Sequence, residues 1–167
     1  GLVIRNAMGR TEFDGAAVTV DSGVVVRDLV RASIERSLSG LEHYTGIPST
    51  VGGALWQNLH FLSPAPARER TMFMAEVVES VELLLPDDSR VRAAAADMRF
   101  GYDTSRLHGS GEIALTAVFR LHPGDRHALE RLRRFLAVLE LADVAGDEHP
   151  ARAIPCRLGR VDAPQQH

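Results

Sequence analysis

Hydrophobic and polar positions along the first forty residues predict two strands followed by an amphipathic helix. β-Branched side chains gather in residues 2–4 and 17–20, and the Asp-Gly turn signal between these runs is typical of a hairpin-like connection. Apolar residues then recur at helical spacing through residues 26–38, and Gly40 follows just past the end. We expect this helix to lie with its apolar side on the sheet.

The pattern predicts three more strands in the second half of the chain. Residues 76–85 alternate imperfectly and are rich in valine and leucine, and a Pro-Asp-Asp turn leads from them into residues 90–92. Residues 113–121 are typical of a largely buried strand. If the strand alternates strictly, one face carries five apolar residues: Ile113, Leu115, Ala117, Phe119 and Leu121.

Leucines at helical spacing predict a second long helix over residues 126–141. The periodicity stops beyond Gly146, and the proline-containing residues 147–167 lack an apolar pattern that could offset the entropy of ordering. Prolines in residues 63–68 predict another irregular segment, extended or looped.

Size, charge and composition limit the classes of protein and partner. The chain has 167 residues, 45% of them hydrophobic and 25% charged, so it can bury the core of one ordinary domain. A net charge of -3 argues against a nucleic-acid partner and against an anionic membrane surface. Lysine is absent, which excludes a lysine nucleophile or Schiff base.

Cysteine usage indicates a reducing compartment. Cys156 is the only cysteine, so no internal disulfide can form, and no cluster of cysteine and histidine has the spacing of metal ligands. The longest apolar runs, such as residues 77–86, are interrupted by glutamates. We therefore expect a cytoplasmic protein with no metal site and no membrane span.

The segment with the clearest chemical signal is residues 44–58. Gly46, Gly52 and Gly53 bracket a Pro-Ser-Thr sequence, and a helix-compatible run follows. Glycines let a backbone approach a phosphate closely, and free N–H groups at a helix start favour negative charge. The alternative is a tight turn with a serine or threonine N-cap. Spacing alone does not separate the two interpretations.

Three ordered motifs resemble the UDP-N-acetylenolpyruvoylglucosamine reductase family, also called UDP-N-acetylmuramate dehydrogenase. Residues 46–54, with Gln57 and Asn58 after them, are similar to its G-I-P-G-T-V-G-G-A…N signature. Residues 38–42 resemble the lead-in to that loop, and residues 99–105 resemble its F-G-Y-R-x-S segment.

The resemblance implies an α+β fold of the PCMH-type FAD-binding class, with an antiparallel or mixed sheet and flanking helices. It implies a central FAD-binding domain at residues 1–122, a connecting helix at 123–145 and an irregular tail at 146–167. It also implies FAD as the cofactor, NADPH as the reductant and a UDP-sugar substrate in peptidoglycan synthesis. The cofactor-binding residues that it implies are Tyr44, Gly46, Ile47, Pro48, Ser49, Thr50, Gly52, Gly53, Ala54, Gln57, Asn58 and Ile113, the last through backbone hydrogen bonds. Tyr102 would contact substrate.

Departures from the family pattern bear on activity. Asp103 stands where the family has the arginine that stabilises the enolic intermediate, and a carboxylate would repel that charge. Either Arg99 or Arg106 takes over the role, or the usual mechanism does not run. The catalytic serine is not found, because its position would fall near Arg160, and the family's first G-x-G-S-N phosphate loop is also missing.

Three functions follow from this comparison of motifs. The first is the FAD-binding portion of a reductase that is inactive as this chain alone, with a second chain as one source of the missing domains. The second is a non-catalytic FAD- or nucleotide-binding relative, which Asp103 favours. The third is a PCMH-type flavin oxidase that acts on another substrate.

Overall fold

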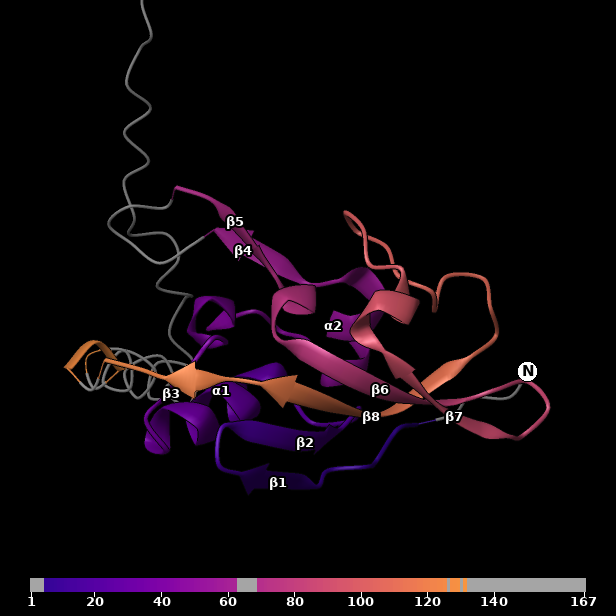
Figure 1. Cartoon of the computed structure of the whole chain (residues 1–167), viewed down its shortest axis with the longest axis horizontal. Coiled ribbons are helices and arrows are strands. Elements are labelled where there is room, and N and C mark those ends of the chain that lie inside the picture. Colours follow the sequence, from indigo (N-terminus) through magenta and orange to yellow (C-terminus); the bar gives the residue numbers. More distant parts are fainter. Residues whose placement is uncertain (1–4, 63–68, 126, 130, 132–167) are drawn as a thin grey trace, which may run out of the picture.

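A five-stranded antiparallel sheet forms the centre of the molecule (Figure 1). The computed structural model describes residues 5–62, 69–125, 127–129 and 131. The strands lie in the order β1-β2-β8-β6-β7, and every neighbouring pair is antiparallel. Their bounds are β1 Thr11–Asp14, β2 Ala17–Asp21, β6 Val78–Leu84, β7 Arg90–Ala94 and β8 Ile113–Arg120.

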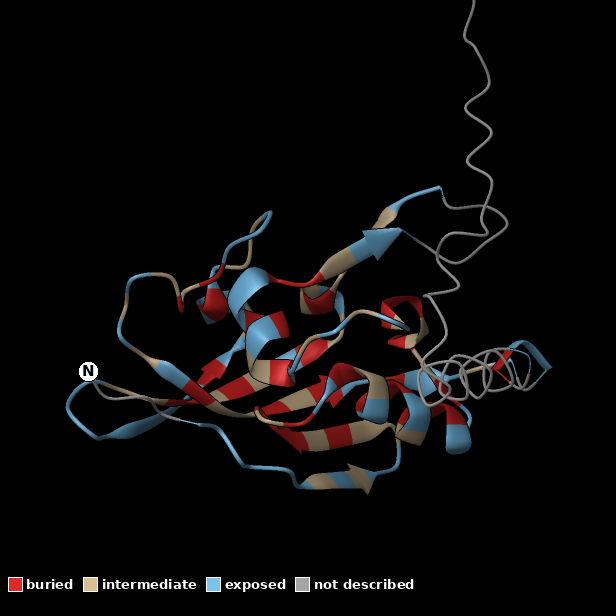
Figure 2. Ribbon diagram, turned by 180° about the vertical axis from the view of Figure 1, so that it is seen from behind, coloured by how far each residue is buried: buried red, intermediate tan, exposed pale blue. Residues whose placement is uncertain are grey.

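Two helices cover one face of this sheet, as Figures 1 and 2 show from opposite sides. Helix α1 spans Val26–Glu35 and buries one apolar side, whereas the short helix α2 spans Val51–Gln57 and contacts β2 and β8. Phe119 of β8, Leu29 of α1 and Leu55 of α2 are all fully buried in the core between the layers. Removal of this apolar surface from water is the main force that holds the helices on the sheet.

Small elements surround the two layers. Strand β3, Leu38–Ser39, pairs with β9, His122–Pro123, and strand β4, His60–Leu62, pairs with β5, Thr71–Phe73. The β4-β5 hairpin projects away from the main sheet (Figure 1). Three 3-10 turns complete the elements: η1 Glu42–Tyr44, η2 Met74–Glu76 and η3 Ala95–Met98.

The strands predicted at 17–20, 76–85, 90–92 and 113–121 are confirmed. The sequence left open whether the sheet is antiparallel or mixed, and the five-stranded sheet is antiparallel throughout. The partner of β2 in the first hairpin is β1, however, and residues 2–4 lie outside the described residues. The hairpin in the described residues is formed by β1 and β2.

The prediction that the first helix continues to residue 38 is wrong. The helix ends at Glu35, and Ser37 adopts a left-handed conformation with φ 57°. That conformation turns the chain, so that Leu38 pairs with Pro123 as a strand residue. The apolar Leu38 fits both periodicities, which explains the error.

Strand β8 does not alternate strictly, because its pairing with β6 contains a bulge. Glu82 pairs with Thr116 while Leu83 pairs with Ala114, so one extra residue lies on β8. The bulge reverses the phase of the strand: Ala114 is buried and Ile113 is 47% exposed. Ile113 is therefore not on the core face where strict alternation places it.

The predicted helix at 126–141 lies almost entirely outside the described residues, as does the tail beyond residue 146. Residues 127–129 are helical, and Leu129 packs into the core. The loop predicted at 63–68 also lies outside the described residues.

Candidate functional site

A pocket of about 270 Å³ lies where the start of α2, the end of β2 and the start of β8 meet. Four of the predicted cofactor-binding residues line it: Thr50, Gly52, Gly53 and Ile113. Six further residues line the pocket and were not predicted as site residues: Asn6, Ser22, Trp56, Leu107, Glu112 and Ala114. They come from five separate stretches of the chain, and only the fold brings them together.

The start of α2 differs from the predicted anion site. The N–H groups of Val51 and Gly52 donate to the carbonyls of Val24 (2.8 Å) and Ser22 (2.7 Å), and the N–H of Gly53 donates to Oγ1 of Thr50 (3.2 Å). The first three N–H groups of the helix are thus already used, which contradicts the idea that they are free for a phosphate. Thr50 is the N-cap of α2, as the alternative interpretation of this loop predicted.

Gly52 has a structural reason to be glycine. A Cβ at this position would lie 3.1 Å from the carbonyl oxygen of Ser22 and 3.3 Å from its Cβ. The missing side chain therefore lets the start of α2 dock against the turn that follows β2. Gly52 and Ser22 both line the pocket.

The first residues of β8 offer an uncovered backbone edge. Strand β2 pairs with β8 only from Arg120 back to Thr116, and the Ser22 N–H then donates to the carbonyl of Leu115 (2.8 Å). Within the described residues no strand covers this edge at Ile113 and Ala114, which line the pocket. This arrangement fits the expectation that Ile113 contacts a cofactor through its backbone.

Trp56, which lines the pocket, is stacked against His108. The rings of Trp56 and His108 stack with centroids 3.6 Å apart and an interplanar angle of 25°. The Ser105 hydroxyl donates to the carbonyl of Trp56 (2.8 Å) and holds the loop against α2. Trp56 immediately precedes Gln57 of the motif, so its place on the pocket side of the helix could have been noticed from the sequence.

One partly buried ion pair lies beside Ile113. Arg106 donates to both carboxylate oxygens of Glu112, from Nη2 to Oε1 at 2.6 Å and from Nε to Oε2 at 2.8 Å. The guanidinium hydrogen bonds, opposed by desolvation, hold the pKa of the Glu112 carboxyl below its ordinary range. Arg106 is thus already paired, and it is not a free cation that could take over the role of the family arginine.

Most of the other predicted contacts lie away from this pocket. Tyr44 is fully buried in the core, where its hydroxyl donates to the carbonyl of Met72 (3.3 Å), and burial raises its pKa. Ala54 is also buried, and Ile47 packs partly against the core. Gly46, Pro48 and Ser49 lie on the surface of the loop, where Gly46 needs its positive φ of 83°.

Gln57 and Asn58 act as structural ties at the end of α2. Gln57 Nε2 donates to Oδ1 of Asp103 (3.0 Å). Asn58 is buried, donates to the carbonyl of Gly101 (2.9 Å) and accepts from the N–H of Ala75 (3.0 Å). Both residues link the motif helix to the turn that resembles the F-G-Y-R-x-S segment.

Asp103 and Tyr102 lie in that turn. Asp103 has φ 54°, and its Oδ1 lies 3.7 Å from Nδ1 of His60. The Tyr102 ring is 72% exposed and lies with its centroid 4.5 Å from that of His60. The exposure of Tyr102 is compatible with a substrate contact, whereas the carboxylate of Asp103 brings negative charge to the same surface.

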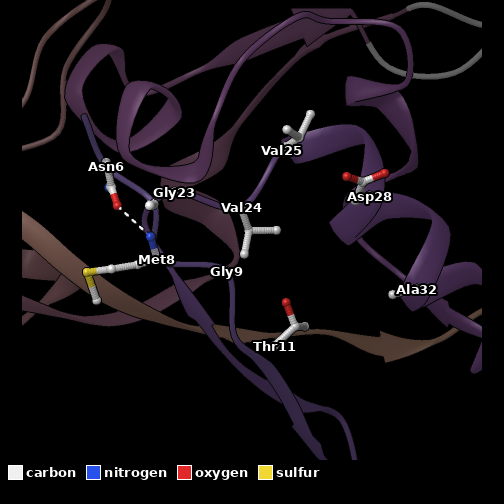
Figure 3. A pocket seen from close by; sticks show the side chains of 10 residues that line it. Asn6, Met8, Gly9, Thr11, Gly23, Val24, Val25, Asp28 and Ala32 are labelled. Atoms are coloured by element: carbon white, nitrogen blue, oxygen red, sulfur yellow. Dashed lines mark hydrogen bonds between the residues drawn. The ribbon is translucent and has the colours of Figure 1, made fainter.

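A second pocket of about 450 Å³ adjoins the first (Figure 3). Asn6 lines both pockets, and its side chain donates to the Ser22 hydroxyl (2.8 Å) and accepts from the N–H of Met8 (3.0 Å). Val24, Val25 and Asp28 form the side of the second pocket nearest α1. None of the three motifs contributes a residue to the lining of this pocket.

The described residues lack two further features, a membrane span and a metal site. No helix there is long and apolar enough to cross a membrane. In the same part of the chain, no three histidine, cysteine or acidic side chains are grouped to hold a metal ion.

Comparison with known proteins identifies relatives that share these elements. The chain is 36% identical over 115 residues to the UDP-N-acetylenolpyruvoylglucosamine reductase of Lactobacillus gasseri, covering 69% of this chain and 35% of the relative. It is 34% identical over 139 residues to the reductase of the same name from Rubrobacter xylanophilus, covering 81% and 44%. The chain thus spans well under half of the length of these relatives.

A solved structure and a family model point to the same kind of protein as these relatives. The crystal structure of UDP-N-acetylenolpyruvylglucosamine reductase from Thermus caldophilus superimposes with a TM-score of 0.57 and 25% identity, covering 78% of this chain and 44% of the other. Residues 1–94, which include β1, β2, both helices and the motif loop, match the FAD binding domain family. The chain belongs to the FAD-binding domain family and carries the α+β fold of its reductase relatives.

Proposed function

We propose that the chain is the FAD-binding portion of an NADPH-dependent reductase that converts UDP-N-acetylglucosamine enolpyruvate to UDP-N-acetylmuramate. The observation that carries the proposal is the pocket in which the motif glycines and the uncovered edge of β8 meet. The names of the relatives supply the reaction. A cytoplasmic location and a role in peptidoglycan synthesis belong to the same proposal.

The residues of the pocket fit part of a dinucleotide. Gly52 lets the start of α2 lie close to Ser22, and the Ser22 and Thr50 side chains offer hydroxyl groups beside the two motif glycines. Ile113 offers backbone groups, and Trp56 offers an aromatic face. We propose that these residues hold FAD, which supplies the hydride-transfer chemistry when it is bound. The other predicted contacts in the loop remain predictions.

Tyr102 and Asp103 would decide what happens to substrate. We propose that the exposed Tyr102 contacts the UDP-sugar and that Asp103 disfavours a developing enolate at the same surface. Little turnover is therefore expected from this chain alone, and we propose a second chain as one source of further catalytic groups. The Asp103 carboxylate also favours a second candidate function, that of a non-catalytic FAD-binding relative.

Purification of the full chain with added FAD tests the proposal. Flavin absorbance that stays with the protein through gel filtration is expected, together with NADPH oxidation that the enolpyruvyl substrate barely stimulates. A colourless protein after loading would contradict the flavin site. Strong stimulation by the substrate would show that this chain is catalytically competent, against the effect proposed for Asp103.

A further inference from the structure

The ion pair between Arg106 and Glu112 differs from the other ion pairs of the described residues in its burial. The Glu112 side chain is 9% exposed and that of Arg106 is 29% exposed. By comparison, Arg120 and Glu79, which also pair through a fork of the guanidinium, are 60% and 46% exposed. A carboxylate that is removed from water needs a partner, because its lost hydration is otherwise uncompensated.

Glu112 lines the pocket proposed for FAD, so the ion pair lies next to the proposed cofactor site. Among the ten residues that line the smaller pocket, Glu112 is the only one with a charged side chain. It directly precedes Ile113 and lines the same pocket as the motif glycines. Arg106 accounts for both of its oxygens, and Arg99 is a second cation that acts on it.

We propose that Arg106 is a positioning residue for FAD, which neutralises and fixes the Glu112 carboxylate so that the anionic pyrophosphate can enter the pocket. The inference rests on the proposed FAD function. Without the guanidinium, the wall of the pocket would carry an unpaired negative charge next to a ligand of the same sign. At the separation of groups that share one pocket, such repulsion weakens binding by about tenfold.

Substitutions of both partners test the inference by FAD titration of the full chain. Arg106→Gln is expected to weaken FAD binding by about tenfold, and Glu112→Gln should change it much less. The double variant Arg106→Gln/Glu112→Gln should regain most of the wild-type affinity, because it removes the unpaired charge. Arg106→Lys keeps the positive charge and should retain most of the affinity, which covers the case in which Arg106→Gln does not fold.

Salt and a matched control separate charge from structure. The deficit of Arg106→Gln should shrink as ionic strength rises, since salt screens the repulsion. Arg120→Gln, which breaks the exposed pair with Glu79, should leave FAD affinity unchanged.

The outcomes distinguish this inference from the proposed function. A wild-type chain that binds no FAD would overturn both. FAD binding that is equal in the wild type and in Arg106→Gln would overturn the inference alone. A double variant as weak as Arg106→Gln would show that the pair only braces the loop, which would also overturn it.

Discussion

At the scale of single residues, the contact between Gly52 and Ser22 sets the start of α2. A methyl group at Gly52 would lie 3.1 Å from a carbonyl oxygen that already accepts the Gly52 N–H, so neither group can move away easily. We expect Gly52→Ala to lower the free energy of unfolding by about 1–2 kcal/mol, although alanine gains helix propensity. Urea unfolding measures this loss.

Gly9→Ala is the matched control for this substitution. No heavy atom lies within 4 Å of a Cβ at Gly9, so its stability should stay close to that of the wild type. A Gly52→Ala variant as stable as Gly9→Ala would show that α2 can shift, and it would contradict the docking role of Gly52.

Asn58 joins three segments through one side chain. Its amide contacts the backbone of Gly101 and Ala75, and its own backbone is left-handed with φ 48°. Asn58→Ala should lower the free energy of unfolding by about 2–3 kcal/mol, because two partly buried backbone groups lose their hydrogen-bond partner. Thermal or urea unfolding checks this value.

Asn58→Gly separates the backbone from the side chain. Glycine accepts a positive φ without strain, so this variant removes the amide contacts alone. We expect it to be less stable than the wild type and more stable than Asn58→Ala. Full stability in Asn58→Gly would mean that only the backbone conformation matters.

At the scale of elements, the lead-in turn η1 is braced by Glu42. The Ser39 hydroxyl and the N–H of Gly40 (2.6 Å) donate to its carboxylate. Burial opposes ionisation, but these hydrogen bonds hold the pKa of Glu42 below its ordinary value of 4.5. The carboxylate therefore stabilises the fold in its ionised form.

The sign of the pH dependence follows from that lowered pKa. The stabilisation is fully present above pH 4.5, the pKa of this carboxyl in the unfolded chain. It is lost as the pH falls through the lower pKa of the folded protein. Glu42→Gln should thus be less stable than the wild type by about 1–2 kcal/mol at neutral pH. The gap should close in acid when unfolding is followed against pH. A stability difference between the two proteins that stays constant below pH 4.5 would contradict the stabilising role of the Glu42 carboxylate.

Periodicity predicted most elements but not their ends or partners. Strands β2 and β6 follow their apolar runs, since each places alternate side chains in the core, whereas β7 follows the turn signal before it and buries only Ala93. The end of α1 and the bulge in β8 depend on tertiary pairing, of Leu38 with Pro123 and of Leu83 with Ala114. Neither pairing leaves a local pattern in the sequence, so both were missed.

At the scale of the whole molecule, the motif located the candidate site without giving its chemistry. Gly52, Gly53, Thr50 and Ile113 were predicted and do meet at one pocket. The free N–H groups expected at the helix start are instead bonded to Ser22, Val24 and Thr50. Those bonds come from a distant turn and a cap, so spacing within the motif could not reveal them.

The remaining wall of the pocket comes from residues far apart in sequence. Asn6, Ser22 and Glu112 belong to segments that carry no recognised motif, and each reaches the site only because β2 and β8 are neighbours in the sheet. A single sequence shows which residues are apolar or glycine, whereas the pairing of distant strands decides which polar groups share a pocket.

The most direct test of the FAD site is the fluorescence of Trp56 during a titration with FAD. Trp56 is the only tryptophan of the chain and lines the pocket, half exposed. We expect saturable quenching by FAD, because a flavin dinucleotide bound there lies beside the indole. We also expect weaker quenching in Gly52→Ala at the same FAD concentrations. Fluorescence that falls only linearly with added FAD, equally in both proteins, would contradict the site.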